Sequence, residues 1–197
     1  MKIGVDCDGV LTDLSAYVWH YGELYFKKKP VNKKVYDVAE IFGCTKKQEL
    51  KFWLKYFWPY CRKWPPRDKA AEVLNNLSQE GHELYEITAR MFVTQKGLLG
   101  WYSRHVLLRW IHKWNFSFLD VCFCNEKTTL QDKLDGCRKY GVEVMIDDKP
   151  DVALCLAEEG IRVLLFDTEY NKEAVHKNIV RVHGWQDIYT AINSMEV

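Results

Sequence analysis

Apolar segments of strand length alternate with amphipathic segments of helix length through the second half of the chain, and this alternation limits the possible folds more than any other feature. Strands joined through helices pair in parallel with right-handed crossovers. We therefore expect an α/β fold, a doubly wound parallel sheet with a binding crevice at the carboxyl ends of its strands. The predicted strands are ELYEIT, LDVCFC, VEVMI and IRVLLF, with helices between them at about 94–114, 131–141 and 150–160.

The first half of the chain begins with one further strand and continues as helices. Residues 2–5 form a short apolar run that leads into the loop DCDGVLTD. A helix is expected from about Leu14. After a basic, proline-containing break, Thr45 and Gln48 form a capping box ahead of a second amphipathic helix.

A helix opened by prolines and closed by Gly81 returns the chain to the sheet. No Gly/Ser linker or low-complexity tract separates the two halves, so the helical segment is an insertion and not a tethered domain. We expect residues 1–13 and 67–197 to form the core domain and residues 14–66 to form a small helical cap inserted after the first strand.

The charge balance excludes whole classes of partner. The 197 residues carry 28 Lys and Arg against 27 Asp and Glu, a net charge of +1, so no strong field attracts a nucleic acid polymer or an anionic membrane. No apolar run reaches the roughly 18 residues that a membrane span needs, and no signal sequence precedes the first aspartates. We expect a cytoplasmic protein, with its oligomeric state open.

Acidic, hydroxyl and lysine residues lie at the predicted ends of several strands. Any one of these motifs is weak, because Asp and Gly are common turn residues and a DD pair can simply cap a helix. All of them at one sheet edge indicate a pocket whose carboxylates need a hard cation, Mg²⁺. They are Asp6 and Asp8 after the first strand, Thr88 after the second, and Asp147 and Asp148 after the fourth, with Lys127 and Lys133 between the last two.

DCDGVLTD, EITAR, a following lysine and MIDDKPD resemble, in this order, the four motifs of the haloacid dehalogenase (HAD) superfamily. The similarity covers nearly the whole chain and is greatest to the 5′(3′)-deoxyribonucleotidases and their bacterial relatives. It implies a Rossmann-like core and hydrolysis of a phosphate monoester through an aspartyl-phosphate. In the implied roles, Asp6 attacks phosphorus, while Asp8 protonates the leaving group and then activates water.

The same resemblance implies a Mg²⁺ site made by the carboxylates of Asp6, Asp147 and Asp148 and the backbone carbonyl of Asp8. A carboxylate held against Mg²⁺ stays ionised and nucleophilic, while the cation offsets the charge of the phosphate. Gly9 is expected to let the backbone pass close to the bound phosphate.

Phosphate contacts are expected from the Thr88 hydroxyl, the Ala89 backbone and one lysine. Lys133 is favoured because a helix start aims its side chain at the strand ends, but Lys127 in the preceding loop is the alternative. Arg90 either contacts the substrate or serves as a structural ion-pair donor, and the sequence does not decide between the two.

Aromatic side chains crowd the expected cap. They can stack on a nucleobase, or they can form the cap's own core. Trp53, Phe57 and Tyr60 have the spacing of a buried helix face, which favours the core. Trp58 and Trp64 lie nearer the return to the core domain, and we expect these two to face the site more readily than Trp53.

The sequence thus predicts a Mg²⁺-dependent phosphomonoesterase that acts on a small phosphorylated substrate, a nucleoside monophosphate in the first place. A sugar phosphate or another small ester is the alternative substrate. A non-catalytic phosphate-binding protein on the same fold is the alternative of another class, but a binder has no use for the proton-transfer residue Asp8.

Overall fold

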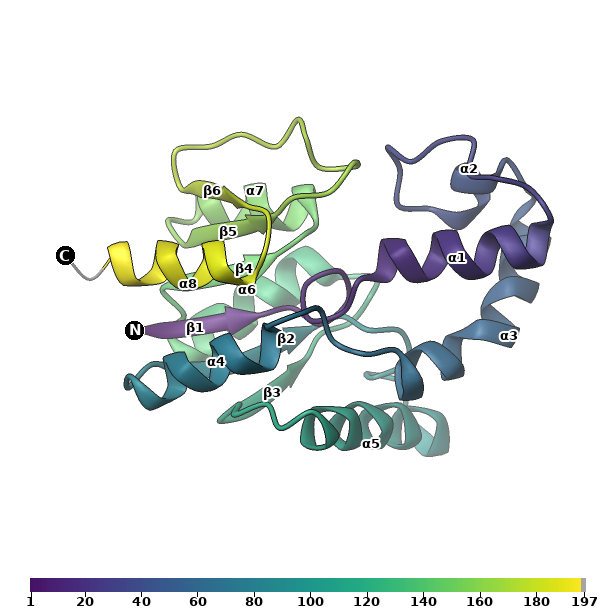
Figure 1. Cartoon of the computed structure of the whole chain (residues 1–197). Helices are drawn as coiled ribbons and strands as arrows, with labels where there is room; N and C mark the ends of the chain where they lie inside the picture. Colours follow the sequence, from purple (N-terminus) through teal and green to yellow (C-terminus); the bar gives the residue numbers. More distant parts are fainter. Residues whose placement is uncertain (196–197) are drawn as a thin grey trace.

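Six parallel strands form one sheet in the computed structural model, which describes residues 1–195 (Figure 1). The strand order is β3-β2-β1-β4-β5-β6, and each neighbouring pair is parallel. The order changes direction between β1 and β4, which opens a crevice at their carboxyl ends. The prediction of a doubly wound parallel sheet is confirmed. The strands are β1 (Lys2–Val5), β2 (Glu83–Thr88), β3 (Asp120–Phe123), β4 (Val144–Asp147), β5 (Arg162–Phe166) and β6 (Ile179–Val182).

Helices cover both faces of this sheet. α4, α5 and α8 pack on one face, and α6 and α7 pack on the other. β6 and α8 continue the chain beyond the last predicted strand. Within residues 1–195, no helix has the length and the apolar character that crossing a bilayer requires. The helices are α1 (Leu14–Phe26), α2 (Val38–Phe42), α3 (Lys46–Lys63), α4 (Ala70–Gln79), α5 (Gly97–Lys113), α6 (Thr129–Tyr140), α7 (Pro150–Glu158) and α8 (Trp185–Ser194).

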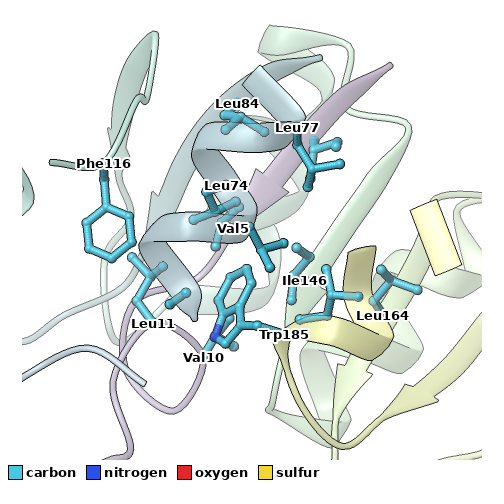
Figure 2. Close-up of a cluster of buried hydrophobic side chains, with 14 of the residues drawn as sticks. Val5, Val10, Leu11, Leu74, Leu77, Leu84, Phe116, Ile146, Leu164 and Trp185 are labelled. Carbon is cyan, nitrogen blue, oxygen red and sulfur yellow. The ribbon is translucent and has the colours of Figure 1, made fainter. Parts of the chain in front are cut away.

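Strand alternation divides the core between the two faces. In β2, Leu84 packs with the α4 side, whereas Tyr85 and Ile87 pack with α6 and α7. Figure 2 shows the first of these cores, in which Val5 of β1 and Trp185 of α8 are buried together. Packing on both faces holds the central strands, and therefore their carboxyl ends, in fixed positions.

α1, α2 and α3 lie beyond the carboxyl ends of the strands and share a hydrophobic cluster that Val106 of α5 joins (Figure 1). Phe42 and Phe52 are fully buried there, and the Phe52 ring stacks on Phe26 with 5.7 Å between the ring centroids. The predicted capping box is present, because Thr45 and Gln48 each accept a hydrogen bond from the other's backbone N–H. The division of the chain into core and cap domains stays a prediction.

Replacement of Phe52 by Ala tests whether this cluster stabilises α1–α3. Loss of a fully buried Phe should lower the free energy of unfolding by about 3 to 5 kcal/mol. Leu54 lies on the same helix but is 73% exposed, so Leu54→Ala should change the free energy of unfolding by less than about 0.5 kcal/mol. Urea denaturation measures both values, and equal effects of the two substitutions would contradict the packing described here.

Candidate active site

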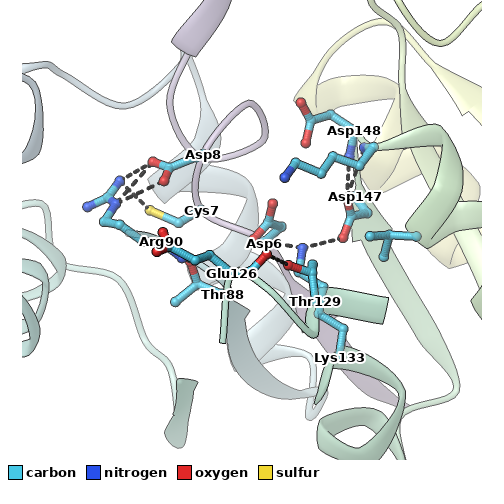
Figure 3. A network of polar contacts seen from close by, with 12 residues as sticks. Asp6, Cys7, Asp8, Thr88, Arg90, Glu126, Thr129, Lys133, Asp147 and Asp148 are labelled. Atoms are coloured by element: carbon cyan, nitrogen blue, oxygen red, sulfur yellow. Dashed lines mark hydrogen bonds and ion pairs between the residues drawn. The ribbon is translucent and has the colours of Figure 1, made fainter. Parts of the chain in front are cut away.

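The carboxyl ends of β1, β2 and β4 bring the predicted acidic and hydroxyl residues to one edge of the sheet (Figure 3). Asp6 directly follows β1, and its backbone N–H donates to the carbonyl of Ile146 at 3.0 Å, so the pairing with β4 continues to the site. Thr88 is the last residue of β2, and Asp147 is the last of β4. All three of these polar side chains are buried.

Asp6, Asp147 and Asp148 form a cluster of buried carboxylates at the point where the strand order reverses. One oxygen atom of each lies within 4.8 Å of the others. The backbone N–H groups of Asp148 and Lys149 donate to Oδ1 of Asp147, both at 2.9 Å, and the Tyr170 hydroxyl donates to Oδ2 of Asp148. Oδ1 of Asp148 is buried and accepts no hydrogen bond from residues 1–195.

Burial raises the pKa of Asp6 to about 6 and the pKa of Asp148 to about 8, and the neighbouring carboxylates contribute to both shifts. A cation would relieve this repulsion and would give Oδ1 of Asp148 a partner. The cluster offers oxygen atoms and neither imidazole nor thiolate, which is the donor set that suits Mg²⁺. The residues present therefore fit the predicted ion.

Lys133 is the lysine that reaches these carboxylates. Its Nζ atom donates to Oδ2 of Asp147 at 2.6 Å and lies 3.0 Å from Oδ1 of Asp6. Burial alone would lower the pKa of this ammonium group, but the carboxylates of Asp147 and Asp6 outweigh it and raise the pKa above its ordinary value. Lys127 lies in the exposed loop before α6, so of the two predicted lysines Lys133 is the one that contacts the carboxylate cluster.

The Asp8 side chain points away from the carboxylate cluster (Figure 3). The guanidinium of Arg90 is ion-paired with it, and Nε of Arg90 lies 3.1 Å from both carboxylate oxygens. The Tyr60 hydroxyl donates to Oδ1 of Asp8 at 2.7 Å and is itself 2.6 Å from the hydroxyl of Thr12. Burial favours a higher pKa for Asp8, but Arg90 and Tyr60 outweigh it and hold the pKa below its ordinary value.

Arg90 therefore makes the structural ion pair that was one of its two predicted roles, and it also lines the space in which a substrate would lie. Next to it, Thr88 and Ala89 line a small hollow that also contains Asp6 and Lys133. These four residues surround one space at the sheet edge. The arrangement places a carboxylate, an ammonium group and a hydroxyl where they could contact one phosphoryl group.

Gly9 is required by the carboxylate cluster. Its φ is +96°, and a Cβ atom at this position would lie 2.0 Å from Oδ2 of Asp148. The structure gives a reason for glycine here that is independent of the predicted close approach to phosphate, which stays a prediction. Any side chain would displace Asp148 and strain the left-handed backbone.

A cavity of about 340 Å³ extends outward from Asp8 between the core and α3. Trp53, Phe57 and Tyr60 of α3 line one wall, and Ala89 belongs to the opposite, core side. A larger groove of about 690 Å³ lies between α3 and α5, but its charged lining residues are all basic and it contains none of the strand-end residues. The 340 Å³ cavity shares Asp8, Ala89 and Arg90 with the small hollow and is therefore the one that adjoins the strand-end residues.

Trp58 and Trp64, which were predicted to face the site more readily than Trp53, do not have that position in the structure. Neither residue lines the cavity, whereas Trp53 does. Trp64 donates from Nε1 to the carbonyl of Asp13 at 3.1 Å, and Trp58 packs against Tyr102 with 4.9 Å between the ring centroids. Trp58 lies five residues after Trp53 on α3 and therefore points about 140° away from it around the helix axis, while Trp64 lies beyond the last residue of the helix.

The chain matches, over residues 1–196, the family described as 5′ nucleotidase, deoxy (pyrimidine), cytosolic type C protein. The chain belongs to this family. A nucleotidase of Clostridium acetobutylicum is 24% identical over 207 residues, which cover 99% of this chain and 95% of the relative. The chain is thus a phosphatase of the HAD superfamily, as its motifs predicted.

Two solved structures share the fold of this nucleotidase family member. D,D-heptose 1,7-bisphosphate phosphatase from B. bronchiseptica, complexed with magnesium and phosphate, has a TM-score of 0.59 and 11% identity, with 99% of each chain covered. A HAD-superfamily hydrolase from Ehrlichia chaffeensis has a TM-score of 0.57 and 13% identity, covering 100% of this chain and 97% of that one. At such low identity, the likeness concerns the fold alone.

The sequence did not single out two residues of this nucleotidase family member that lie at the mouth of the site. Tyr36 and Lys149 line both the small hollow and the 340 Å³ cavity, with Nζ of Lys149 4.7 Å from the centre of the Tyr36 ring. Lys149 stands inside the MIDDKPD motif and could have been found there. Tyr36 lies in a loop without periodicity, so no local pattern indicated it.

The raised pKa values of the carboxylate cluster predict that stabilisation of the protein by Mg²⁺ depends on pH. Without metal, the folded protein keeps protons on Asp6 and Asp148 up to about pH 6 and 8, whereas the unfolded chain releases them near pH 4. The free energy of unfolding of the metal-free protein should therefore fall as pH rises through this window. The increase in melting temperature caused by Mg²⁺ should grow over the same range.

Thermal melts at several pH values, with and without Mg²⁺, measure this increment. Asp148→Asn should raise the melting temperature of the metal-free protein and remove most of the increment, because one repelling ligand is lost. Asp151→Asn, at an exposed carboxylate of α7, is the matched control and should behave like the wild type. If Mg²⁺ did not raise the melting temperature, or raised it by the same amount at every pH, the assignment of the cluster as a metal site would be contradicted.

Proposed function

We propose that this protein is a Mg²⁺-dependent 5′-nucleotidase that hydrolyses (deoxy)nucleoside monophosphates through an aspartyl-phosphate on Asp6. One observation carries the proposal: two carboxylates two residues apart are held in opposite environments. Asp6 lies against Lys133 and the carboxylate cluster, whereas Asp8 is held by Arg90 and faces the cavity. The family description and the name of the Clostridium relative support a nucleotide as the substrate and a cytosolic location.

In the first half of the reaction, a carboxylate oxygen of Asp6 forms a bond to phosphorus as the bond from phosphorus to the ester oxygen breaks. Asp8 gives its proton to that departing oxygen. Lys133, the Thr88 hydroxyl and the Ala89 backbone N–H bind the phosphoryl oxygens. The carboxylates of Asp6, Asp147 and Asp148 and the Asp8 carbonyl would hold Mg²⁺, which would supply positive charge to offset the charge of the phosphate.

In the second half, Asp8 accepts a proton from a water molecule whose oxygen attacks phosphorus. The bond between phosphorus and the Asp6 oxygen breaks, which yields inorganic phosphate and regenerates the carboxylate. Arg90 favours proton acceptance by Asp8, because the ion pair lowers the pKa of Asp8 and keeps its carboxylate ionised. For the first half, the negative phosphate beside Asp8 favours the protonated form that the departing oxygen needs.

The helices α1–α3, residues 14–66, act as the cap of residues 1–13 and 67–197. Tyr60 of α3 bonds Asp8 directly, so the cap contributes to the catalytic centre and to the cavity together. The aromatic lining by Trp53 and Phe57 favours a leaving group with a flat apolar part over a sugar phosphate. Trp53 takes the stacking role that the sequence analysis gave to Trp58 and Trp64.

Asparagine substitutions at the two carboxylates should have different kinetic consequences. Asp6→Asn should lower kcat by at least about 10³-fold without loss of fold, because an amide is nearly isosteric but does not attack phosphorus. Asp8→Asn should still accept a phosphoryl group from p-nitrophenyl phosphate, whose leaving group needs no proton, but should then hydrolyse the phosphoenzyme slowly. Rapid mixing should therefore show a burst of one p-nitrophenolate per Asp8→Asn enzyme.

Asp68→Asn, at an exposed carboxylate before α4, is the control and should retain wild-type turnover. Circular dichroism and melting temperature establish that each variant is folded. Wild-type turnover by a folded Asp6→Asn variant would remove Asp6 from the reaction. A steady rate without a burst in Asp8→Asn would remove Asp8 from the second half.

A further inference from the structure

One face of α3 runs from the catalytic centre to the outer part of the cavity. Tyr60 contacts Asp8, and Phe57, Trp53 and Glu49 follow it toward the start of the helix at intervals of three, four and four residues. This is the spacing of one helix face, and all four side chains line the same cavity. At 1.5 Å of rise per residue, Glu49 lies about 16 Å along the helix axis from Tyr60.

The charged lining of the cavity differs between its two ends. The end shared with the small hollow carries Lys149 and the ion-paired Asp8 and Arg90, with Lys133 in the hollow itself. Glu126 lines the cavity from the loop before α6. At the start of α3 the cavity is lined by two carboxylates, Asp37 and Glu49. The Glu49 side chain is only 15% exposed.

Lys46 holds these two carboxylates from outside the cavity. Its ammonium group is 2.9 Å from Oε2 of Glu49 and is also ion-paired with Oδ2 of Asp37, yet its own side chain is 71% exposed and does not line the cavity. A carboxylate accepts hydrogen bonds and repels the oxygen of a carbonyl group. This end of the cavity therefore suits a ligand edge that donates hydrogen bonds.

Phosphate, sugar and base lie in series in a nucleoside monophosphate, and α3 offers contacts in the same order. With the phosphate beside Asp8, a base in this cavity would lie along Trp53 and present its outer edge toward Glu49. We infer that Glu49, with Asp37 beside it, determines base specificity and selects nucleoside monophosphates whose base has an exocyclic amino group over those with a carbonyl oxygen at the same position. This inference rests on the proposed nucleotidase activity.

A purely structural role for Glu49 makes a different prediction. Glu49 lies in the first turn of α3, where a negative charge favours the helix dipole, and it pairs with Lys46 three residues earlier. Both effects stabilise the helix. Neither distinguishes an amino group from a carbonyl group on a substrate.

The test compares kcat/KM for dCMP and dUMP, which differ in the amino or carbonyl group at one ring position. The wild type should prefer dCMP about tenfold, the order expected for one hydrogen bond to a partly exposed carboxylate. Glu49→Gln should bring the ratio to about one or reverse it, because an amide also donates to a carbonyl oxygen. Glu72→Gln, at an exposed glutamate in the first turn of α4, is the matched control and should leave the ratio unchanged.

Equal kcat/KM values for dCMP and dUMP in the wild type would overturn the specificity inference while leaving the nucleotidase proposal intact. An unchanged ratio in Glu49→Gln, with a lowered melting temperature and both substrates equally affected, would assign Glu49 a structural role only and would also overturn it. Hydrolysis of glycerol phosphate but of neither nucleotide would overturn the proposed function, and the inference with it.

Discussion

Repulsion among buried carboxylates is the constraint on which the rest of the site depends. The sheet holds Asp6, Asp147 and Asp148 within 4.8 Å of one another, away from water. Lys133 offsets part of this charge, and burial together with the neighbouring carboxylates raises the pKa values of Asp6 and Asp148. Such a cluster is costly to fold without a counter-ion, so its presence indicates a cation site rather than a stabilising core.

A second set of contacts separates Asp8 from this cluster. Arg90 and Tyr60 turn its carboxylate toward the cavity, and Thr12 is hydrogen-bonded to Tyr60. Tyr60 belongs to α3, so the same helix that contacts Asp8 also lines the cavity. In our proposal, catalysis and substrate selection are linked through one helix face.

The parts of the structure that depend on periodicity were predictable from the sequence. Alternating strands and helices indicated the parallel sheet, and the parallel sheet in turn implied that Asp6, Thr88 and Asp147 meet at one edge. The capping box of Thr45 and Gln48 was likewise a local signal, and it is present.

Features that depend on contacts between distant segments were not predictable in this way. Arg90 meets Asp8 across 82 positions of sequence, and nothing near either residue indicates the ion pair. Trp53, Trp58 and Trp64 have the same side chain, and only the rotation of α3 against the core decides which one lines the cavity. Tyr36 reaches the site from an irregular loop.

The stereochemical course at phosphorus tests the covalent route through Asp6 most directly. The substrate is a nucleoside phosphorothioate made chiral with oxygen isotopes, and hydrolysis takes place in isotopically labelled water. Two successive in-line displacements, first by Asp6 and then by water, predict overall retention of configuration in the thiophosphate product. Inversion would mean a single displacement by water and would contradict the aspartyl-phosphate mechanism.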